Sequence, residues 1–301
     1  MLLKGKNKKG EQMSIIKGFI VSLIAVGGFQ HSKELCEGFV EENDMYITAD
    51  AKGLVGGINE EDFNDVIDQA SAIYAPIFTE QGVNLIVERK WSDGTVNAYA
   101  RQSGKNWIVS MFGGLARHET TTKDAFMLVI CHEIGHHIGG APKYTDWYGN
   151  PDWASNEGQS DYFAGLKCAR KVFSQENNVA LMANQEVPEM VKAHCANEHV
   201  AAEAQAICAR IAMAGQQVGY LFQDLRKEST VPAFETPDTK EVSKTSHRHP
   251  GTQCRLDTYF NSGVCGMDFN VDVDQADYKT GACIATTHEL GNRPRCWFKP
   301  E

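Results

Sequence analysis

Residues 132–136 carry two histidines and a glutamate in the pattern HExxH, His132-Glu133-Ile134-Gly135-His136. Side chains four residues apart project from one face of an α-helix, so both imidazoles can bind one zinc ion. Glu133 follows the first histidine and can reach a water molecule at the metal without binding the metal itself. The pattern therefore predicts a hydrolytic site with one zinc ion per chain, if these residues are helical.

A catalytic zinc site takes three protein ligands and leaves one position open. The third ligand is suggested by Glu157, which lies 25 residues after His132 and begins a helix that can pack across the first. Asp161 follows one helical turn later and is predicted to hydrogen-bond the other ring nitrogen of His132. The plainer alternatives are incidental histidines on an amphipathic helix and a surface carboxylate at Asp161.

The helix that carries HExxH is predicted to begin near Thr121, where Thr121-Thr122-Lys123-Asp124 resembles a capping box. It should run through Ile138 and end at the two glycines that follow. Apolar spacing and acidic first turns predict further helices over 59–80, from about 157 to 174, and within 187–227.

Three strand-like runs precede the HExxH helix and are separated by turn residues, which favours an antiparallel meander. They are Asn84–Arg89, Thr95–Gln102 and Asn106–Phe112. Residues 143–155 are expected to form a loop rich in aromatic residues. The cysteine-rich tail from residue 254 onward is expected to be irregular and held by disulfides.

HExxH followed by Asn156-Glu157-Gly158-Gln159-Ser160-Asp161 resembles the gluzincin metallopeptidases, thermolysin included. Two further stretches narrow the resemblance to the HtpX and CAAX-prenyl-protease type: Val96–Ala100 with the strand and glycines after it, and His249–Leu256, which is similar to their HPxxxxRI motif. These matches cover about a third of the chain. The chain differs from that type in its disulfide-like tail and in lacking transmembrane helices, which suggests an exported relative that does not act on prenyl-proteins.

The resemblance implies roles for individual residues. Glu157 would be the third zinc ligand and Asp161 its partner behind His132, with Asn106–Phe112 as the edge strand that binds an extended peptide. Glu133 would act as the general base on a zinc-activated water. His249 is favoured as the donor to the oxyanion, or as a fourth zinc ligand that keeps an enzyme latent. His247, Arg255 and Tyr259 are the other candidates for that donor.

The expected fold is an α+β, zincin-like domain with an HExxH helix, a small antiparallel sheet, further helices and a disulfide-rich C-terminal tail. The expected ranges are a signal peptide over 1–28, the metallopeptidase domain over 29–250 and a cysteine-rich extension over 251–301 packed on it.

An apolar run of 12 residues, Gly18–Phe29, follows a lysine-rich start. It is shorter than the roughly 20 residues that span a bilayer. It therefore fits a secretory signal peptide cleaved after Val26-Gly27-Gly28, with Met13 as an alternative start. An uncleaved anchor or a buried strand is the alternative. We expect a periplasmic or secreted protein without stable membrane insertion.

Nine cysteines support export, because six of them lie in the last 110 residues outside any CxxC pair, as disulfides would. The odd number leaves one cysteine over, and Cys131 is the expected one because it should be buried in the HExxH helix.

With 29 basic and 39 acidic residues the net charge is −10, which argues against a nucleic-acid partner.

The sequence thus predicts a zinc-dependent endopeptidase with a protein or peptide substrate. Peptidoglycan or another amide fits the same chemistry, and the oligomeric state is not readable from the sequence. Two alternatives remain: an exported zinc-bearing chaperone or assembly factor with latent protease activity, and a disulfide-stapled binding module with a vestigial site.

Overall fold

The structure, a computed structural model, describes residues 36–50 and 56–300, which all belong to one compact unit. The predicted signal peptide and the alternative start at Met13 lie outside the described residues. The described elements, in chain order, are α1 (Glu60–Glu80), β1 (Asn84–Lys90), β2 (Ala98–Ser103), β3 (Asn106–Phe112), α2 (Gly113–Arg117), α3 (Lys123–Ile138), β4 (Lys143–Thr145), β5 (Pro151–Ser155), α4 (Glu157–Phe163), the π-helical turn η1 (Ala164–Ala169), α5 (Arg170–Phe173), α6 (Asn178–Met182), α7 (Glu189–Glu198), α8 (Ala202–Leu225) and α9 (Thr252–Val264).

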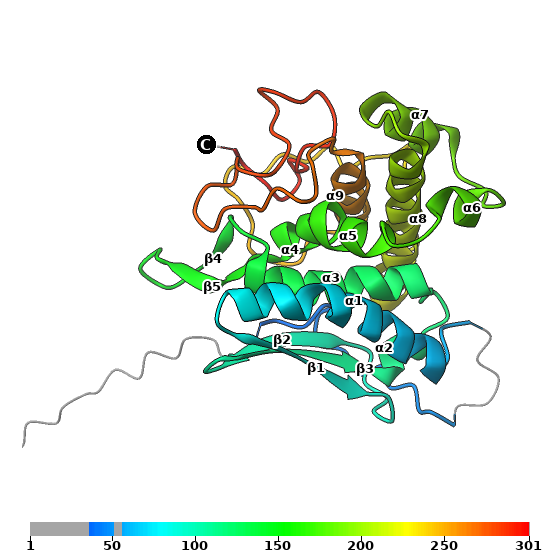
Figure 1. The fold of residues 1–301 in the computed structure, drawn as a ribbon, viewed down its shortest axis with the longest axis vertical. Coiled ribbons are helices and arrows are strands. Elements are labelled where there is room, and N and C mark those ends of the chain that lie inside the picture. The colour runs from blue at the N-terminus through cyan, green and yellow to red at the C-terminus, as the bar shows by residue number, and fades with distance from the viewer. Residues whose placement is uncertain (1–35, 51–55, 301) are drawn as a thin grey trace, which may run out of the picture. The chain divides into compact units, whose positions relative to one another are not determined.

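Helix α3 lies at the centre of these elements (Figure 1). Its N-cap is Thr122, whose side chain accepts a hydrogen bond from the Ala125 amide, and it ends before Gly139, close to the predicted bounds. Every residue from Ala125 to His137 is buried, because α1 and the sheet cover one side of the helix while α4, η1 and α8 cover the other. A helix buried on all sides holds polar side chains away from bulk water.

Helix α1 forms as the sequence predicts. The side chain of Asn59 caps it by accepting a hydrogen bond from the Asp62 amide, and three acidic residues fill the first turn. Its apolar face packs on α3 and on β1. The buried side chains of that face are Phe63, Val66, Ile67, Ala70, Tyr74 and Phe78.

The three-stranded sheet has the order β1-β3-β2, so the predicted antiparallel meander is wrong. β1 pairs with β3 in parallel, while β2 and β3 form an antiparallel hairpin whose turn contains Gly104 with φ +60°. The longer connection between β1 and β2 carries the chain past β3 to its far side. The central strand is therefore β3, and the expected edge strand Asn106–Phe112 is corrected to Ala98–Ser103.

Helix α4, η1 and α5 follow one another directly over 157–173, matching the predicted helix. This segment packs against α3 and brings the Cα atoms of Cys131 and Cys168 to 5.4 Å. The two cysteines form a disulfide, so the expectation that Cys131 is the one left over is wrong. Helix packing decides this pairing, and sequence spacing does not reveal it. The ninth cysteine, outside the four disulfides, is Cys36.

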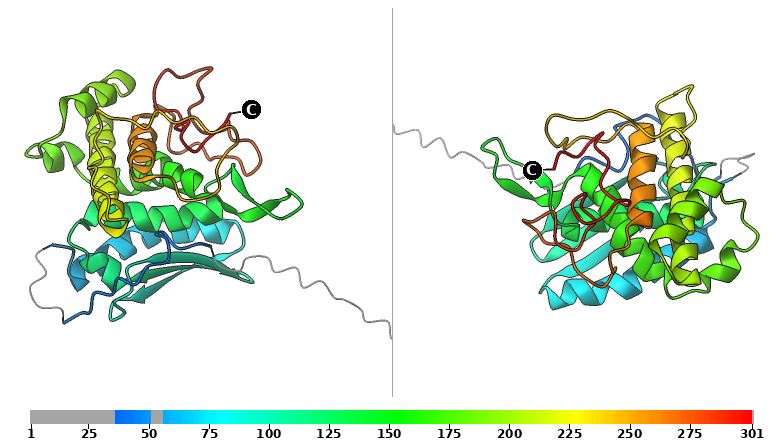
Figure 2. Two further views of the ribbon diagram at one scale, coloured as in Figure 1. Left: turned by 180° about the vertical axis from the view of Figure 1, so that it is seen from behind. Right: turned by 90° about the horizontal axis from the view of Figure 1, so that it is seen from above.

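The other three disulfides join Cys195 to Cys208, Cys254 to Cys296 and Cys265 to Cys283. The prediction of an irregular tail from residue 254 is wrong for its first part, because α9 extends to Val264 and packs against α8. Beyond α9 the chain has no helix or strand up to residue 300 and winds over α4 and α9 (Figure 2).

The tail holds the beginning of α4. Trp297 is fully buried, and its Nε1 donates a hydrogen bond to Thr258 Oγ1 at 3.0 Å. Its ring lies so close to Gly158 that a Cβ atom at that position would be 2.3 Å from it. Glycine is therefore required beside Glu157, and the tail helps to fix that residue.

Within the described ranges, no helix combines the length and apolar character needed to cross a membrane.

Candidate metal centre

Helix α3 presents His132 and His136 on one face, as their spacing of four predicts. Both side chains are fully buried, and their rings lie edge to face with centroids 4.6 Å apart. Each ring turns its Nε2 atom toward Glu157, the first residue of α4. The helix begins there because the Asn156 side chain accepts a hydrogen bond from the Gln159 amide.

Glu157 lies between the two histidines. Its Oε2 is 3.3 Å from His132 Nε2, and its Oε1 is 3.6 Å from His136 Nε2. One ligand atom from each of the three residues lies within 4.8 Å of the other two. Two atoms held about 2.0–2.1 Å from one zinc ion at a tetrahedral angle are roughly 3.3 Å apart. The spacing of these atoms therefore fits a single metal ion.

Three of the candidate ligand atoms make no hydrogen bond, although His249 Nε2 and Arg255 Nη2 lie 3.2 Å and 3.7 Å from Glu157 Oε2. His132 Nε2, His136 Nε2 and Glu157 Oε2 are buried and make no hydrogen bond to any described residue. Buried polar atoms are nearly always satisfied, so a group of three such atoms facing one another requires an explanation. A bound cation would satisfy all three, and these residues therefore fit a metal ion.

The other ring nitrogens are held by acceptors. His132 Nδ1 lies 2.7 Å from Asp161 Oδ1, and His136 Nδ1 lies 2.9 Å from the Ser155 carbonyl oxygen. In each case Nδ1 donates its hydrogen, which leaves Nε2 with a lone pair for a metal ion. Asp161 was predicted at this position behind His132, and the structure places it there.

Asp161 is itself anchored by two residues of α9. Arg255 Nη2 donates to Asp161 Oδ1 at 3.0 Å, and the hydroxyl of Tyr259 donates to the same atom at 2.6 Å. Burial would raise the pKa of Asp161, but the Arg255 guanidinium and, after it, His132 lower it. Arg255 and Tyr259, two of the candidate oxyanion donors, are thus engaged with Asp161.

Glu133 points from the same helix and is fully buried. Both of its carboxylate oxygens lack a hydrogen-bond partner among the described residues. Burial raises its pKa to about 8, with the negative charge of Glu157 adding to the effect. A carboxylate with a raised pKa and no fixed partner can accept a proton near neutral pH.

The carboxylates dominate the electrostatics of the centre. Burial alone would lower the pKa of His132, yet Asp161 and Glu157 raise it to about 9. For His136 burial prevails and lowers the pKa to about 4. Among the protein groups alone, the centre thus favours a proton on His132, and a metal cation would satisfy the same negative field.

His249 approaches the centre from the segment that precedes α9. Its Nε2 lies 3.2 Å from Glu157 Oε2 and 2.7 Å from the carbonyl oxygen of Gly38. It is not one of the three residues whose ligand atoms lie within 4.8 Å of one another. His247, the remaining candidate donor, contacts the Asn156 side chain instead, at 3.3 Å.

Tyr144 is a site residue that the sequence reasoning missed. It belongs to the β4–β5 hairpin, which replaces the expected loop over 143–155. Its hydroxyl donates a hydrogen bond to Glu157 Oε1 at 2.7 Å. Trp147 and Tyr148 lie exposed at the hairpin tip. The local sequence does not show which of these three aromatic side chains contacts Glu157, because the register of the hairpin decides this.

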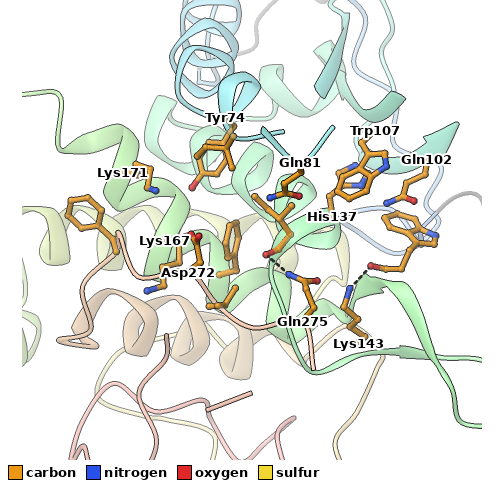
Figure 3. Close-up of a pocket in the computed structure, with 16 residues that line it drawn as sticks. Tyr74, Gln81, Gln102, Trp107, His137, Lys143, Lys167, Lys171, Asp272 and Gln275 are labelled. Carbon is orange, nitrogen blue, oxygen red and sulfur yellow. Dashed lines mark hydrogen bonds between the residues drawn. The ribbon is translucent and has the colours of Figure 1, made fainter. Parts of the chain in front are cut away.

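His137, next to His136, faces away from the centre. Its ring stacks between Trp107 at 5.4 Å and Trp153 at 5.1 Å, and burial lowers its pKa to about 3. It lines a cavity of about 430 Å³ that includes none of the three ligand candidates (Figure 3).

Comparisons of this chain with family models, with curated proteins and with solved structures found no match.

Proposed function

We propose that the protein is a zinc-dependent endopeptidase. The observation that carries this proposal is the group of three buried ligand atoms without hydrogen bonds, beside a buried carboxylate that also lacks a partner. His132, His136 and Glu157 would hold the ion. A zinc ion bound there would supply Lewis acidity toward the substrate carbonyl and the attacking water.

The residues of the chain have separable tasks in this proposal. Glu133 takes a proton from the attacking water and passes it to the leaving amine. His249 directs its Nε2 to the place of a carbonyl oxygen, as its contact with Gly38 illustrates, and can stabilise negative charge developing there. Asp161 keeps the His132 ring in the tautomer that leaves Nε2 available.

The edge strand β2 supports a peptide as the substrate. Among the described strands it pairs with β3 on one side only, and it packs close to α3. An extended peptide can add to such an edge through main-chain hydrogen bonds. A helix with HExxH beside a small sheet, followed by a helix with the third ligand, is compatible with the zincin-like class that the sequence suggests.

The disulfides bear on where the protein works. Eight of the nine cysteines are paired, and such a content is typical of proteins from oxidising compartments. We therefore propose that the protein is exported and works in the periplasm or outside the cell.

Metal content per chain, measured by mass spectrometry on protein made in an oxidising compartment, tests the centre. We expect about one zinc ion in the wild type and a loss or strong weakening in Glu157→Ala. His137→Phe is the matched control, because this buried histidine of α3 lies outside the ligand group. An absence of zinc in correctly folded wild-type protein would contradict the proposal.

Glu133→Gln tests the activity separately. The variant should retain zinc and lose hydrolysis of a peptide library by on the order of 10²–10⁴-fold, the usual contribution of a general base. Unchanged biological function in this variant would instead support an assembly factor or chaperone in which proteolysis is dispensable.

A further inference from the structure

The chain's own residues 36–40 lie along the edge strand β2. The amide of Cys36 donates to the Ala100 carbonyl at 3.0 Å, and the amide of Phe39 donates to the Ala98 carbonyl at 2.9 Å. From Cys36 to Phe39 the residue numbers rise, whereas those of their β2 partners fall from Ala100 to Ala98, so the segment runs antiparallel to β2. This segment is the beginning of the blue part of the chain in Figure 1. It occupies the edge at which a peptide substrate would add.

The side chain of Asn97 fixes the end of this pairing. Its Oδ1 accepts a hydrogen bond from the amide of Val40, and its Nδ2 donates to the carbonyl of the same residue, both at 3.1 Å. An asparagine that binds both polar groups of one main-chain unit sets the register of the segment. The register decides which peptide bond faces the metal centre.

The peptide bond between Gly38 and Phe39 is linked to the centre through His249. The Gly38 carbonyl oxygen accepts a hydrogen bond from His249 Nε2 at 2.7 Å, and that nitrogen is 3.2 Å from Glu157 Oε2. On the other side of the bond, Arg255 Nη1 donates to the Phe39 carbonyl oxygen at 2.9 Å. Two donors from the α9 region thus hold consecutive carbonyl groups beside the ligand group.

The side chain of Phe39 enters a closed aromatic pocket. It is fully buried, with its ring edge to face against His132 at 5.0 Å and against Phe222 at 5.5 Å. The Arg255 guanidinium covers the ring at 4.4 Å. The contact with His132 places this pocket directly beside the metal centre.

The residue before the bond must be small. A Cβ atom on Gly38 would lie 2.6 Å from the side-chain amide of Asn97, closer than real contacts allow. Any larger residue would displace the asparagine that sets the register. The site therefore combines a close fit at the residue before the bond with a deep aromatic pocket for the residue after it.

We propose that the Gly38–Phe39 peptide bond occupies the scissile position, and that this protein cleaves its own chain there. The inference rests on the proposed peptidase function. In the reaction the oxygen of water joins the Gly38 carbonyl carbon and the C–N bond breaks. Both protons of the water end on the Phe39 nitrogen, the first by way of Glu133. The products are a Gly38 carboxylate and a chain that begins with the ammonium group of Phe39.

This cleavage would also open the site to other substrates. While the chain is intact, residues 36–38 hold the part of the β2 edge next to Ala100. After cleavage that part can dissociate and leave the edge to another peptide.

The test uses the full zinc-loaded chain, with intact-mass measurement and N-terminal sequencing over time. We expect wild-type protein that begins at Phe39, and Glu133→Gln protein that stays uncleaved at this bond. The first-order rate constant should not change on tenfold dilution, because the segment lies in its own site. Gly38→Val should slow the cleavage at least tenfold, whereas Phe39→Leu, which keeps an apolar side chain in the pocket, should still be cut.

The outcomes separate this inference from the proposed function. If wild-type protein cuts a peptide library but leaves Gly38–Phe39 intact, the self-cleavage is overturned and the peptidase stands. If the zinc-loaded protein cuts neither, the peptidase itself is overturned. Equal cleavage at this bond in Glu133→Gln, or an undiminished rate in Gly38→Val, would also overturn the inference, because another protease or another register would then be responsible.

Discussion

Asp161 Oδ1 lies 2.7 Å from His132 Nδ1 and connects the metal centre to α9. The same carboxylate receives the Arg255 guanidinium and the Tyr259 hydroxyl, so a residue of α4 ties together α3 and α9. Arg255, which lies 123 positions after His132 in the chain, thereby helps to fix the orientation of the His132 ring.

Asp161→Asn should lower the zinc affinity by about 10–100-fold, the usual effect of losing a partner behind a metal-bound histidine. The amide cannot supply the negative charge that holds the His132 tautomer. Competition against a chromophoric chelator measures the affinity. Tyr259→Phe is the control, because it removes one hydrogen bond and keeps the carboxylate, so its loss should be smaller. Equal affinities for Asp161→Asn and wild type would contradict the role.

Gly158→Ala should destabilise the protein by about 1–3 kcal/mol, as overpacking a filled core does. The added methyl group would meet the Trp297 ring and displace the beginning of α4, so zinc affinity should fall as well. Gly251→Ala is the matched control, because a Cβ there meets no atom within 4 Å and its φ is −59°. Urea unfolding and zinc titration measure both effects. A zinc affinity unchanged by Gly158→Ala would show that the tail does not position Glu157.

Replacing both Cys131 and Cys168 by alanine should lower the free energy of unfolding by about 2–4 kcal/mol. This disulfide closes a span of 37 residues, and the Cys195–Cys208 disulfide closes one of 13. The loss of the longer loop should therefore cost more stability than the loss of the shorter one. Denaturant unfolding of the two double variants compares them. The reverse order would show that strain or local packing outweighs loop entropy.

Asp257 gives a prediction for the pH dependence of stability. Burial raises its pKa to about 6 in the folded protein, above the ordinary value of 3.8. A carboxyl group with a raised folded pKa favours folding most below pH 4, and this contribution is lost as the pH rises through 6. Asp257→Asn should therefore flatten the stability profile between pH 4 and 8, by about 3 kcal/mol.

Urea midpoints measured across that pH range check this expectation. Asp44→Asn is the control, because this exposed residue lies outside the core. A profile for Asp257→Asn that parallels the wild type would contradict the raised pKa.

The sequence predicts much of the local structure and of the metal centre. The bounds of α1 and α3 follow from their caps and apolar spacing, which are local signals. His132, Glu133 and His136 are three positions on one helix, so helix geometry alone brings them together. Glu157 and Asp161 are predicted from their place in a second helix, and the structure brings both to the first.

Only the tertiary structure decides the order of the strands, the disulfide partners and the lining of the centre. The β1-β3-β2 order depends on which edge the chain crosses to, and local turn signals are the same in either case. Cys131 meets Cys168 because two helices pack. Tyr144 reaches Glu157 through a hairpin register, and Gly38 reaches His249 across 211 positions of sequence. Contacts of this kind arise from packing between distant segments, whereas spacing along the chain encodes only what a single helix or turn can hold.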